Sequence, residues 1–155
     1  RIEFEPESSL ELINTESFSY SSIRNIIIPK NVKVIEKSSF YLCRNLVEVD
    51  INQDSQLSMN ASSFSSTGLK SFRFPKGTKL VNNNLFNDCY ELKSIELLGD
   101  DVIIKRHCVF FQNATLISFP NAKNVSIYSY RSLISDYVII FTSPSANFKT
   151  DIDEY

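Results

Sequence analysis

One pattern of apolar residues recurs every 22 to 24 residues along most of the chain. The opening apolar residue of each copy falls at Ile23, Leu46, Leu69, Leu92 and Leu116. An aromatic position follows the same step and forms a second column, at Phe18, Phe40, Phe64, Phe86, Phe110 and then Leu133. Because two columns keep one period, the sequence predicts a solenoid in which each copy forms one coil.

Each copy opens with a short alternation of apolar and other residues, and in some copies a proline follows, as Pro29 follows Ile26 and Ile28. Alternation directs one face of a strand inward, and proline ends the strand because it cannot donate the next ladder hydrogen bond. Strands of successive copies should therefore pair at about 4.8 Å, which gives a parallel sheet.

The second half of each copy carries the aromatic residue, and we expect a single helical or 3₁₀ turn there. Small groups follow the aromatic residue by three positions, at Cys43, Thr67, Cys89 and Asn113. In a buried turn such side chains hydrogen-bond backbone groups that would otherwise be unpaired.

The repeats predict a single domain over residues 1–155. It comprises a partial N-terminal repeat, five repeats, and a terminal strand with an acidic tail (1–22, 23–45, 46–68, 69–91, 92–115, 116–137 and 138–155). Pro6 precedes Pro29 by one repeat step, and the first residue is Arg1, so we expect the chain to be a fragment of a longer protein. A chain of 155 residues, 43% of them hydrophobic, can bury one core.

Charge and composition exclude several classes of function. The formal net charge is −2, with no basic stripe, which disfavours nucleic acid as a partner. No apolar run approaches the roughly 18 residues of a membrane span. The sequence shows no nucleophile–base pair, metal cluster or phosphate loop, and it has only three glycines. We therefore expect no enzyme activity, no cofactor and no metal.

The three cysteines, Cys43, Cys89 and Cys108, raise disulfide, metal and catalytic interpretations. Cys43 and Cys89 occupy one column two coils apart, hence about 10 Å, which is too far for a disulfide. His107 has no partner at metal-ligand spacing. Adjacent residues of an extended segment point to opposite faces, which argues against a Cys108–His107 catalytic pair. The column position predicts buried structural thiols.

The outward residues of the strands form the candidate functional surface. Ile27, Asp50, Arg73 and Glu96 follow one another at the repeat step, so that Arg73 should reach both Asp50 and Glu96. The flanking columns hold Arg24, Val47, Lys70, Lys93 and Ile117, and Asn25, Glu48, Ser71, Ser94 and Ser118. These residues either form a solvated face, adding under about 1 kcal/mol per ion pair, or bind a partner. The candidate binding residues are Ile27, Glu48, Asp50, Lys70, Arg73, Lys93 and Glu96.

Three Asn-x-Ser/Thr triplets, at Asn60, Asn113 and Asn124, could accept N-linked glycans in a secreted protein. Asn113 lies in the inward column with the cysteines and should be unavailable. Asn60 and Asn124 are predicted to lie outside the strands and to be accessible.

The stretches 40–46 and 86–95 resemble the BspA-like class of leucine-rich repeats, whose copies read L-x-x-I-x-I-P-x-x-V-x-x-I-x-x-x-A-F-x-x-C-x-x-L. The resemblance covers residues 6–144, with a departure at 116–120, where the copy has lost two strand residues. It implies a right-handed solenoid of about five to six rungs, mainly β with short helical turns and a parallel sheet on the concave face.

The same resemblance implies a non-enzymatic protein-binding or adhesion module, secreted or on the cell surface, whose partners include host or extracellular-matrix proteins. The alternative is a scaffold subunit of a large assembly, such as a cytoskeletal one in the cytoplasm, with neighbouring subunits as partners.

Overall fold

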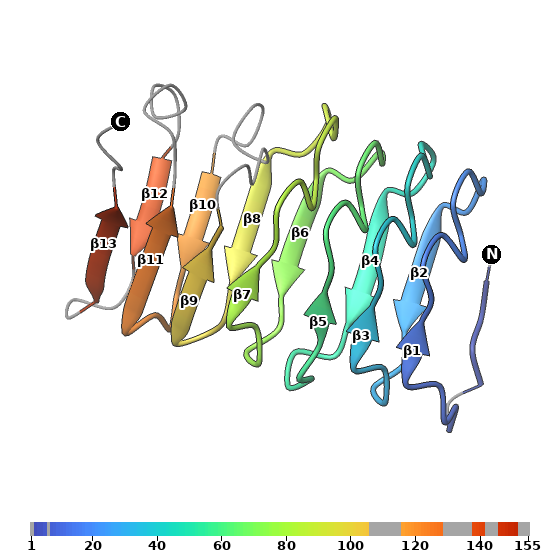
Figure 1. The fold of residues 1–155 in the computed structure, drawn as a ribbon, viewed down its shortest axis with the longest axis horizontal. Helices are drawn as coiled ribbons and strands as arrows, with labels where there is room; N and C mark the ends of the chain where they lie inside the picture. The colour runs from blue at the N-terminus through green and yellow to red at the C-terminus, as the bar shows by residue number, and fades with distance from the viewer. Residues whose placement is uncertain (1, 6, 106–115, 129–137, 142–145, 152–155) are drawn as a thin grey trace.

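The computed structural model describes residues 2–5, 7–105, 116–128, 138–141 and 146–151 (Figure 1). Short strands make up its regular structure: β1 (Leu12–Ile13), β2 (Asn25–Ile28), β3 (Val34–Ile35), β4 (Glu48–Ile51), β5 (Ser58–Met59), β6 (Ser71–Phe74), β7 (Leu80–Val81), β8 (Ser94–Leu97), β9 (Asp101–Ile104), β10 (Leu116–Phe119), β11 (Asn124–Tyr128), β12 (Val138–Phe141) and β13 (Asn147–Asp151). The described residues wind through about five turns of a β-solenoid, which confirms the predicted fold class.

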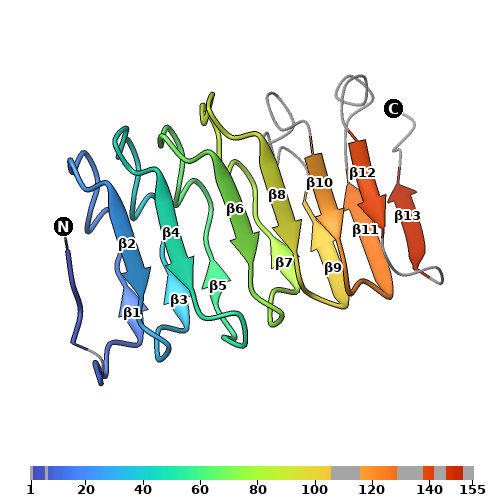
Figure 2. The ribbon, with the colours of Figure 1, turned by 180° about the vertical axis from the view of Figure 1, so that it is seen from behind.

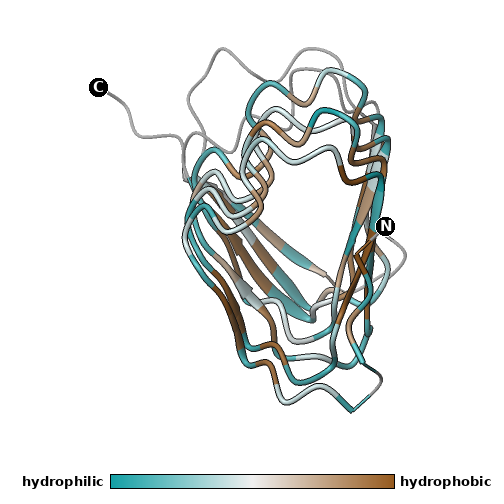
Figure 3. Cartoon of the chain, turned by 90° about the vertical axis from the view of Figure 1, so that its right-hand side faces the viewer, coloured by the Kyte–Doolittle hydropathy of each residue, from teal (hydrophilic) through white to brown (hydrophobic). Residues whose placement is uncertain are grey.

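The strands form two walls, and every strand pair within them is parallel. One wall contains the predicted strands, ordered β2-β4 and then β6-β8-β10-β12. The other wall, ordered β1-β3-β5 and then β7-β9-β11-β13, was not predicted. Figure 2 shows the stack from behind, and Figure 3 shows end-on that the coils overlie one another.

The strand registers correct the predicted start of one repeat. Leu116 pairs with Ser94, and Ile117 pairs with Ile95. Leu116 is therefore not the equivalent of Leu92, and the strand at 116–119 has lost no residues. Ile117 is buried and does not belong to the exposed flanking column. Leu116 also pairs with Val138, while the proline predicted to end that last strand, Pro144, lies outside the described residues.

Stacked phenylalanine rings run through the core, one from each coil. The centroids of Phe18 and Phe40 are 5.2 Å apart, those of Phe40 and Phe64 5.1 Å, and those of Phe64 and Phe86 6.0 Å. The rings of the first two pairs are nearly parallel, with interplanar angles of 5° and 2°. The predicted aromatic column is therefore confirmed as far as Phe86, and Phe110 and Leu133 lie outside the described residues.

The segments around these rings are consecutive turns, and the described residues contain no helix. In the first coil alternate N–H groups close turns on the carbonyl three residues back: Ser17 to Asn14, Ser19 to Glu16 and Ser21 to Phe18. The intervening N–H groups cross to the next coil: Glu16 to Lys37, Phe18 to Ser39 and Tyr20 to Tyr41. A helix would direct every N–H along its own axis, so this division between two directions replaces the predicted helical turn.

Two residues in each of these turn segments have a left-handed backbone. The positive φ angles fall at Glu16, Tyr20, Ser38, Leu42, Ser62, Ser66, Asn84 and Asp88. Where the turn bond is closed, as from Ser17 to Asn14, the left-handed residue is the third of four, as in a type II turn. Glycine or asparagine is preferred there, because a Cβ atom raises the energy of this conformation.

The small groups after the phenylalanines satisfy the backbone as predicted. The Cys43 thiol donates to the Phe18 carbonyl at 3.0 Å, and the Cys89 thiol donates to the Phe64 carbonyl at 3.1 Å. The Thr67 hydroxyl donates to the same Phe64 carbonyl at 2.9 Å. Each group thereby pairs an acceptor that burial removes from water.

Both walls are interrupted between the coils 46–68 and 69–91, because β4 does not pair with β6 and β5 does not pair with β7. We call this place the β4–β6 joint. The coil before it is one residue longer between its two strands, since Ile51 and Met59 are eight residues apart whereas Phe74 and Val81 are seven apart. Gly77 accommodates the longer loop, because a Cβ atom at Gly77 would lie 2.5 Å from the Ser55 carbonyl oxygen.

Replacing Phe86 by alanine tests the aromatic stack. Phe86 is 1% exposed and contacts the rings of Phe64, Phe72 and Phe74. We expect Phe86→Ala to lower the free energy of unfolding by about 3 to 5 kcal/mol, measured by urea denaturation. Tyr90→Ala, at a ring that is 64% exposed, is the control. A loss at Phe86 below about 1 kcal/mol would contradict its place in the core.

Replacing Glu16 by glycine tests the left-handed turns. Glu16 is exposed and has a φ of 56°. Removing its Cβ relieves about 1 to 2 kcal/mol of strain against about 0.5 to 1 kcal/mol of added backbone entropy. We expect Glu16→Gly to raise the free energy of unfolding by up to about 1 kcal/mol, whereas the control Lys37→Gly, at an exposed site with ordinary φ, should lower it. A loss of stability in both variants would refute the turn geometry.

Candidate functional site

The cysteines offer no catalytic or metal centre in the part of the chain that the structure describes. Cys43 and Cys89 are buried free thiols. No group of three or more His, Cys, Asp or Glu residues is placed to hold a metal ion among the described residues. His107 and Cys108 lie outside those residues. The prediction of buried structural thiols is therefore confirmed for Cys43 and Cys89.

The two sequons that were expected to be accessible are engaged in hydrogen bonds between coils. The Asn60 amide donates to Glu36 Oε2 at 2.8 Å, and the Asn124 amide donates to Asp101 Oδ1 at 2.5 Å. Asn124 is also the first residue of β11, so its predicted place outside the strands was wrong. A glycan attaches through these same amide nitrogens and would leave each of them a single N–H.

The outward residues of the first wall form the strand strip, which we define as Ile27, Glu48, Asp50, Lys70, Arg73, Lys93 and Glu96. Within the predicted column of Ile27, Asp50, Arg73 and Glu96, the strand pairing places Ile27 beside Asp50 and Arg73 beside Glu96. The β4–β6 joint separates the two halves, so Asp50 and Arg73 are not paired strand residues. Arg73 Nε forms an ion pair with Glu96 Oε2.

The strip is divided electrostatically at the joint. Arg73 is engaged by Glu96, and among the described residues neither Asp50 nor Glu48 forms an ion pair, so the expected bridge from Arg73 to Asp50 was wrong. Lys70 and Lys93 are exposed beyond the joint. β4 thus presents two carboxylates, and the side of β6 and β8 presents cationic groups.

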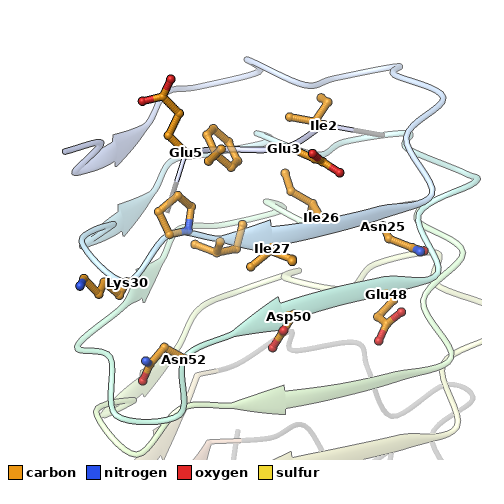
Figure 4. Close-up of a pocket in the computed structure, with 13 residues that line it drawn as sticks. Ile2, Glu3, Glu5, Asn25, Ile26, Ile27, Lys30, Glu48, Asp50 and Asn52 are labelled. Atoms are coloured by element: carbon orange, nitrogen blue, oxygen red, sulfur yellow. The ribbon is translucent and has the colours of Figure 1, made fainter. Parts of the chain in front are cut away.

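Two hollows lie on either side of β4, and Glu48 and Asp50 line both. The N-terminal hollow, of about 900 Å³, is bounded by residues 2–5, β2 and β4 (Figure 4). The smaller one, of about 440 Å³, lies over the β4–β6 joint and includes Arg73 and Glu96. Within the N-terminal hollow Ile27 is 59% exposed, the highest value among the large aliphatic side chains of the described residues.

Contacts in the second wall and in the loops that lead into it link one coil to the next. Ion pairs join Lys33 to Glu11 at 2.6 Å, Lys76 to Asp54 at 2.7 Å and Lys123 to Asp100 at 3.1 Å. The Asn147 amide donates to Asn124, which in turn donates to Asp101. The alternation in Asp101–Ile104 and Asn124–Tyr128 could have revealed this wall, but β1, β3, β5 and β7 are only two residues long.

The geometry defines the chain as a parallel β-solenoid of leucine-rich-repeat type. The sequence model of the BspA-type leucine-rich repeat region matches residues 6–135 in six copies. The chain belongs to this family. No curated protein and no solved structure matches it. In the part of the chain that is described, no helix could cross a lipid bilayer.

Alkylation tests the burial of the cysteine column. Burial raises the pKa of the Cys89 thiol, so at pH 8 it holds its proton more firmly than an exposed thiol does. We expect iodoacetamide to modify Cys43 and Cys89 at least about 100-fold more slowly in the native protein than in urea, because modification requires local opening. A new thiol at the exposed position Ser22, in Ser22→Cys, should react rapidly in both states. Rates for Cys43 and Cys89 equal to that of the new thiol would overturn the assignment.

The raised pKa also sets the direction of a stability change with pH. The folded state holds the Cys89 proton more tightly than the unfolded chain does. The protonated thiol therefore contributes fully to the stability of the folded state at any pH below the ordinary thiol pKa. It is lost as the pH rises through the raised pKa of the folded state.

Proposed function

We propose that this protein is a non-enzymatic protein-binding module that engages its partner through the strand strip. Leucine-rich repeat domains generally bind proteins, and a solenoid of this type is typically a binding scaffold. The observation that carries the proposal is the strip itself: an exposed Ile27 beside the carboxylates of Glu48 and Asp50, which have no ion pair among the described residues.

The energetics of the strip support a role in binding. Exposed ion pairs such as Arg73–Glu96 add under about 1 kcal/mol to stability. Charged groups on an open face contribute mainly to the selection of a partner and to its rate of association. Adhesion at the cell surface, or after secretion, is the setting we propose, since BspA-type proteins are often found there in bacteria.

Reversing two charges tests this function. We expect Arg73→Glu with Lys93→Glu to reduce the amount of partner captured by the immobilised protein at least about tenfold. The melting temperature should change by less than about 2 °C, because both residues are exposed. Capture is measured by quantitative mass spectrometry of the proteins retained from cells and from extracellular matrix.

The control carries the same change of charge away from the strip, in Lys37→Glu with Lys105→Glu. Both control residues are exposed. Equal capture by wild type, strip variant and control would exclude the basic part of the strip as the binding surface.

A further inference from the structure

We propose that the β4–β6 joint is a hinge, at which the wall that carries the strand strip opens and closes. The structure holds the open form, in which Arg73 is paired with Glu96. In the closed form β4 pairs with β6, and Arg73 exchanges Glu96 for Asp50. The inference does not depend on the proposed function, because it concerns only contacts within the chain.

The ends of the coils keep main-chain bonds across the joint. Seen end-on, each coil has two walls that meet through the turn segments at one end and through loops at the other (Figure 3). In the turn segments the Phe64 N–H bonds to the Leu85 carbonyl at 3.1 Å. In the loops the Lys76 N–H bonds to the Gln53 carbonyl at 2.9 Å. A movement at the joint is therefore restrained at both ends of the coil.

The two walls are joined less well than these ends, and they differ from one another. Among the described residues no hydrogen bond or ion pair joins β4 to β6, whereas β2 pairs with β4, and β6 with β8, along their full lengths. In the second wall the Asn82 side-chain amide donates to the Met59 carbonyl at 2.7 Å. The wall that carries the strip is thus the side on which a change of angle breaks no hydrogen bond. We infer that the hinge opens and closes on this side.

The phenylalanine stack shows a change of angle at the same boundary. The ring planes of Phe40 and Phe64 differ by 2°, whereas those of Phe64 and Phe86, which belong to the coils on either side of the joint, differ by 21°. The distance between ring centroids increases from 5.1 to 6.0 Å. Aromatic pairs remain favourable over centroid distances of about 4.5 to 7 Å. The stack can therefore act as a pivot without losing contact.

The smaller hollow, of about 440 Å³, provides space for closure, because it lies over the joint and is lined by Asp50, Arg73 and Glu96. Arg73 is one repeat step of 23 residues from Asp50 and the same step from Glu96. Paired strands lie about 4.8 Å apart, so closure would bring Asp50 as near to Arg73 as Glu96 is in the open form. Exposed ion pairs of this kind contribute little to stability. The exchange of partners therefore favours neither form strongly.

Closure would change the surface that the strand strip presents. Glu48 and Asp50 lie before the joint, whereas Lys70, Arg73 and Lys93 lie after it. The separation of these two groups of charges therefore depends on the angle of the hinge. A ligand that binds one form better than the other shifts the population towards that form.

The test uses the 155-residue chain and dibromobimane, a reagent that becomes fluorescent when it links two neighbouring thiols. Glu48 and Ser71 are exposed and lie one repeat step apart across the joint. Glu48→Cys with Ser71→Cys should therefore be linked in the closed form. The positive control is Asn25→Cys with Glu48→Cys, at residues that are paired strand neighbours. The negative control is Asn25→Cys with Ser71→Cys, two steps and about 10 Å apart, and the wild-type chain with its native cysteines is the blank.

We expect the Glu48/Ser71 pair to be linked about 10- to 1,000-fold more slowly than the Asn25/Glu48 pair, as for a closed form populated at about 0.1 to 10%. It should still be linked faster than the Asn25/Ser71 pair. Adding Glu96→Gln releases Arg73 and should raise the rate at the Glu48/Ser71 pair severalfold. Adding Asp50→Asn as well removes the new partner of Arg73 and should abolish that increase.

The outcomes separate the two parts of the proposal. Linking of the Glu48/Ser71 pair as fast as that of the Asn25/Glu48 pair would mean that β4 and β6 already pair. Linking as slow as that of the Asn25/Ser71 pair would mean that the joint does not close. Either result overturns the hinge, and a rate unchanged by Glu96→Gln overturns the exchange of partners by Arg73.

Discussion

The structure depends on contact between each coil and the next along one side of the solenoid, which the turn segments around the stacked phenylalanines form. We call this side the turn edge. There, stacked phenylalanine rings and backbone hydrogen bonds join successive coils. The Phe40 ring stacks on the Phe64 ring of the next coil, and the Phe40 N–H bonds to the Ser63 carbonyl of that coil. A single coil cannot form these bonds, since half of its turn N–H groups find their acceptors in a neighbour. Stacking therefore supplies both the apolar burial and the backbone pairing that one repeat lacks.

Polar side chains at the turn edge donate hydrogen bonds to its backbone carbonyl groups. The Ser39 hydroxyl donates to the Glu36 carbonyl at 2.6 Å, and the Ser65 hydroxyl donates to the Asn87 carbonyl of the following coil at 2.9 Å. Cys43 and Cys89 have the same role with sulfur as donor. Buried carbonyl groups require such partners because water cannot reach them, so the small residues are as necessary as the apolar ones.

Much of the fold could be predicted from the sequence because the repeat step places equivalent residues above one another. The phenylalanine column, the thiol column and the pairing of Ile27 with Asp50 all follow from that spacing. The turn geometry could not be predicted, since Glu16, Tyr20 and Leu42 are not residues that favour a left-handed backbone. The second wall was missed because several of its strands are only two residues long.

The start of one repeat was misplaced because Leu116 mimics an opening leucine, whereas its strand pairing equates it with Ser94. The strand strip could be located from the outward columns, and its residues are exposed or half-buried as expected. The interruption between Asp50 and Arg73 could not be foreseen from the columns, because their spacing of 23 residues is regular there. The N-terminal hollow depends on how residues 2–5 lie beside β2, which no periodicity specifies.

The β4–β6 joint has a consequence for how the array comes apart. Across this boundary the coils share the turn edge, where Phe64 N–H bonds to the Leu85 carbonyl, a main-chain bond from Lys76 N–H to the Gln53 carbonyl, and side-chain contacts such as Lys76 with Asp54, but neither wall is continuous. In a linear array cooperativity passes only between nearest neighbours, so the boundary with the fewest connections limits it. We expect the molecule to melt as two blocks that meet here, with β4 at the end of one and β6 at the start of the other.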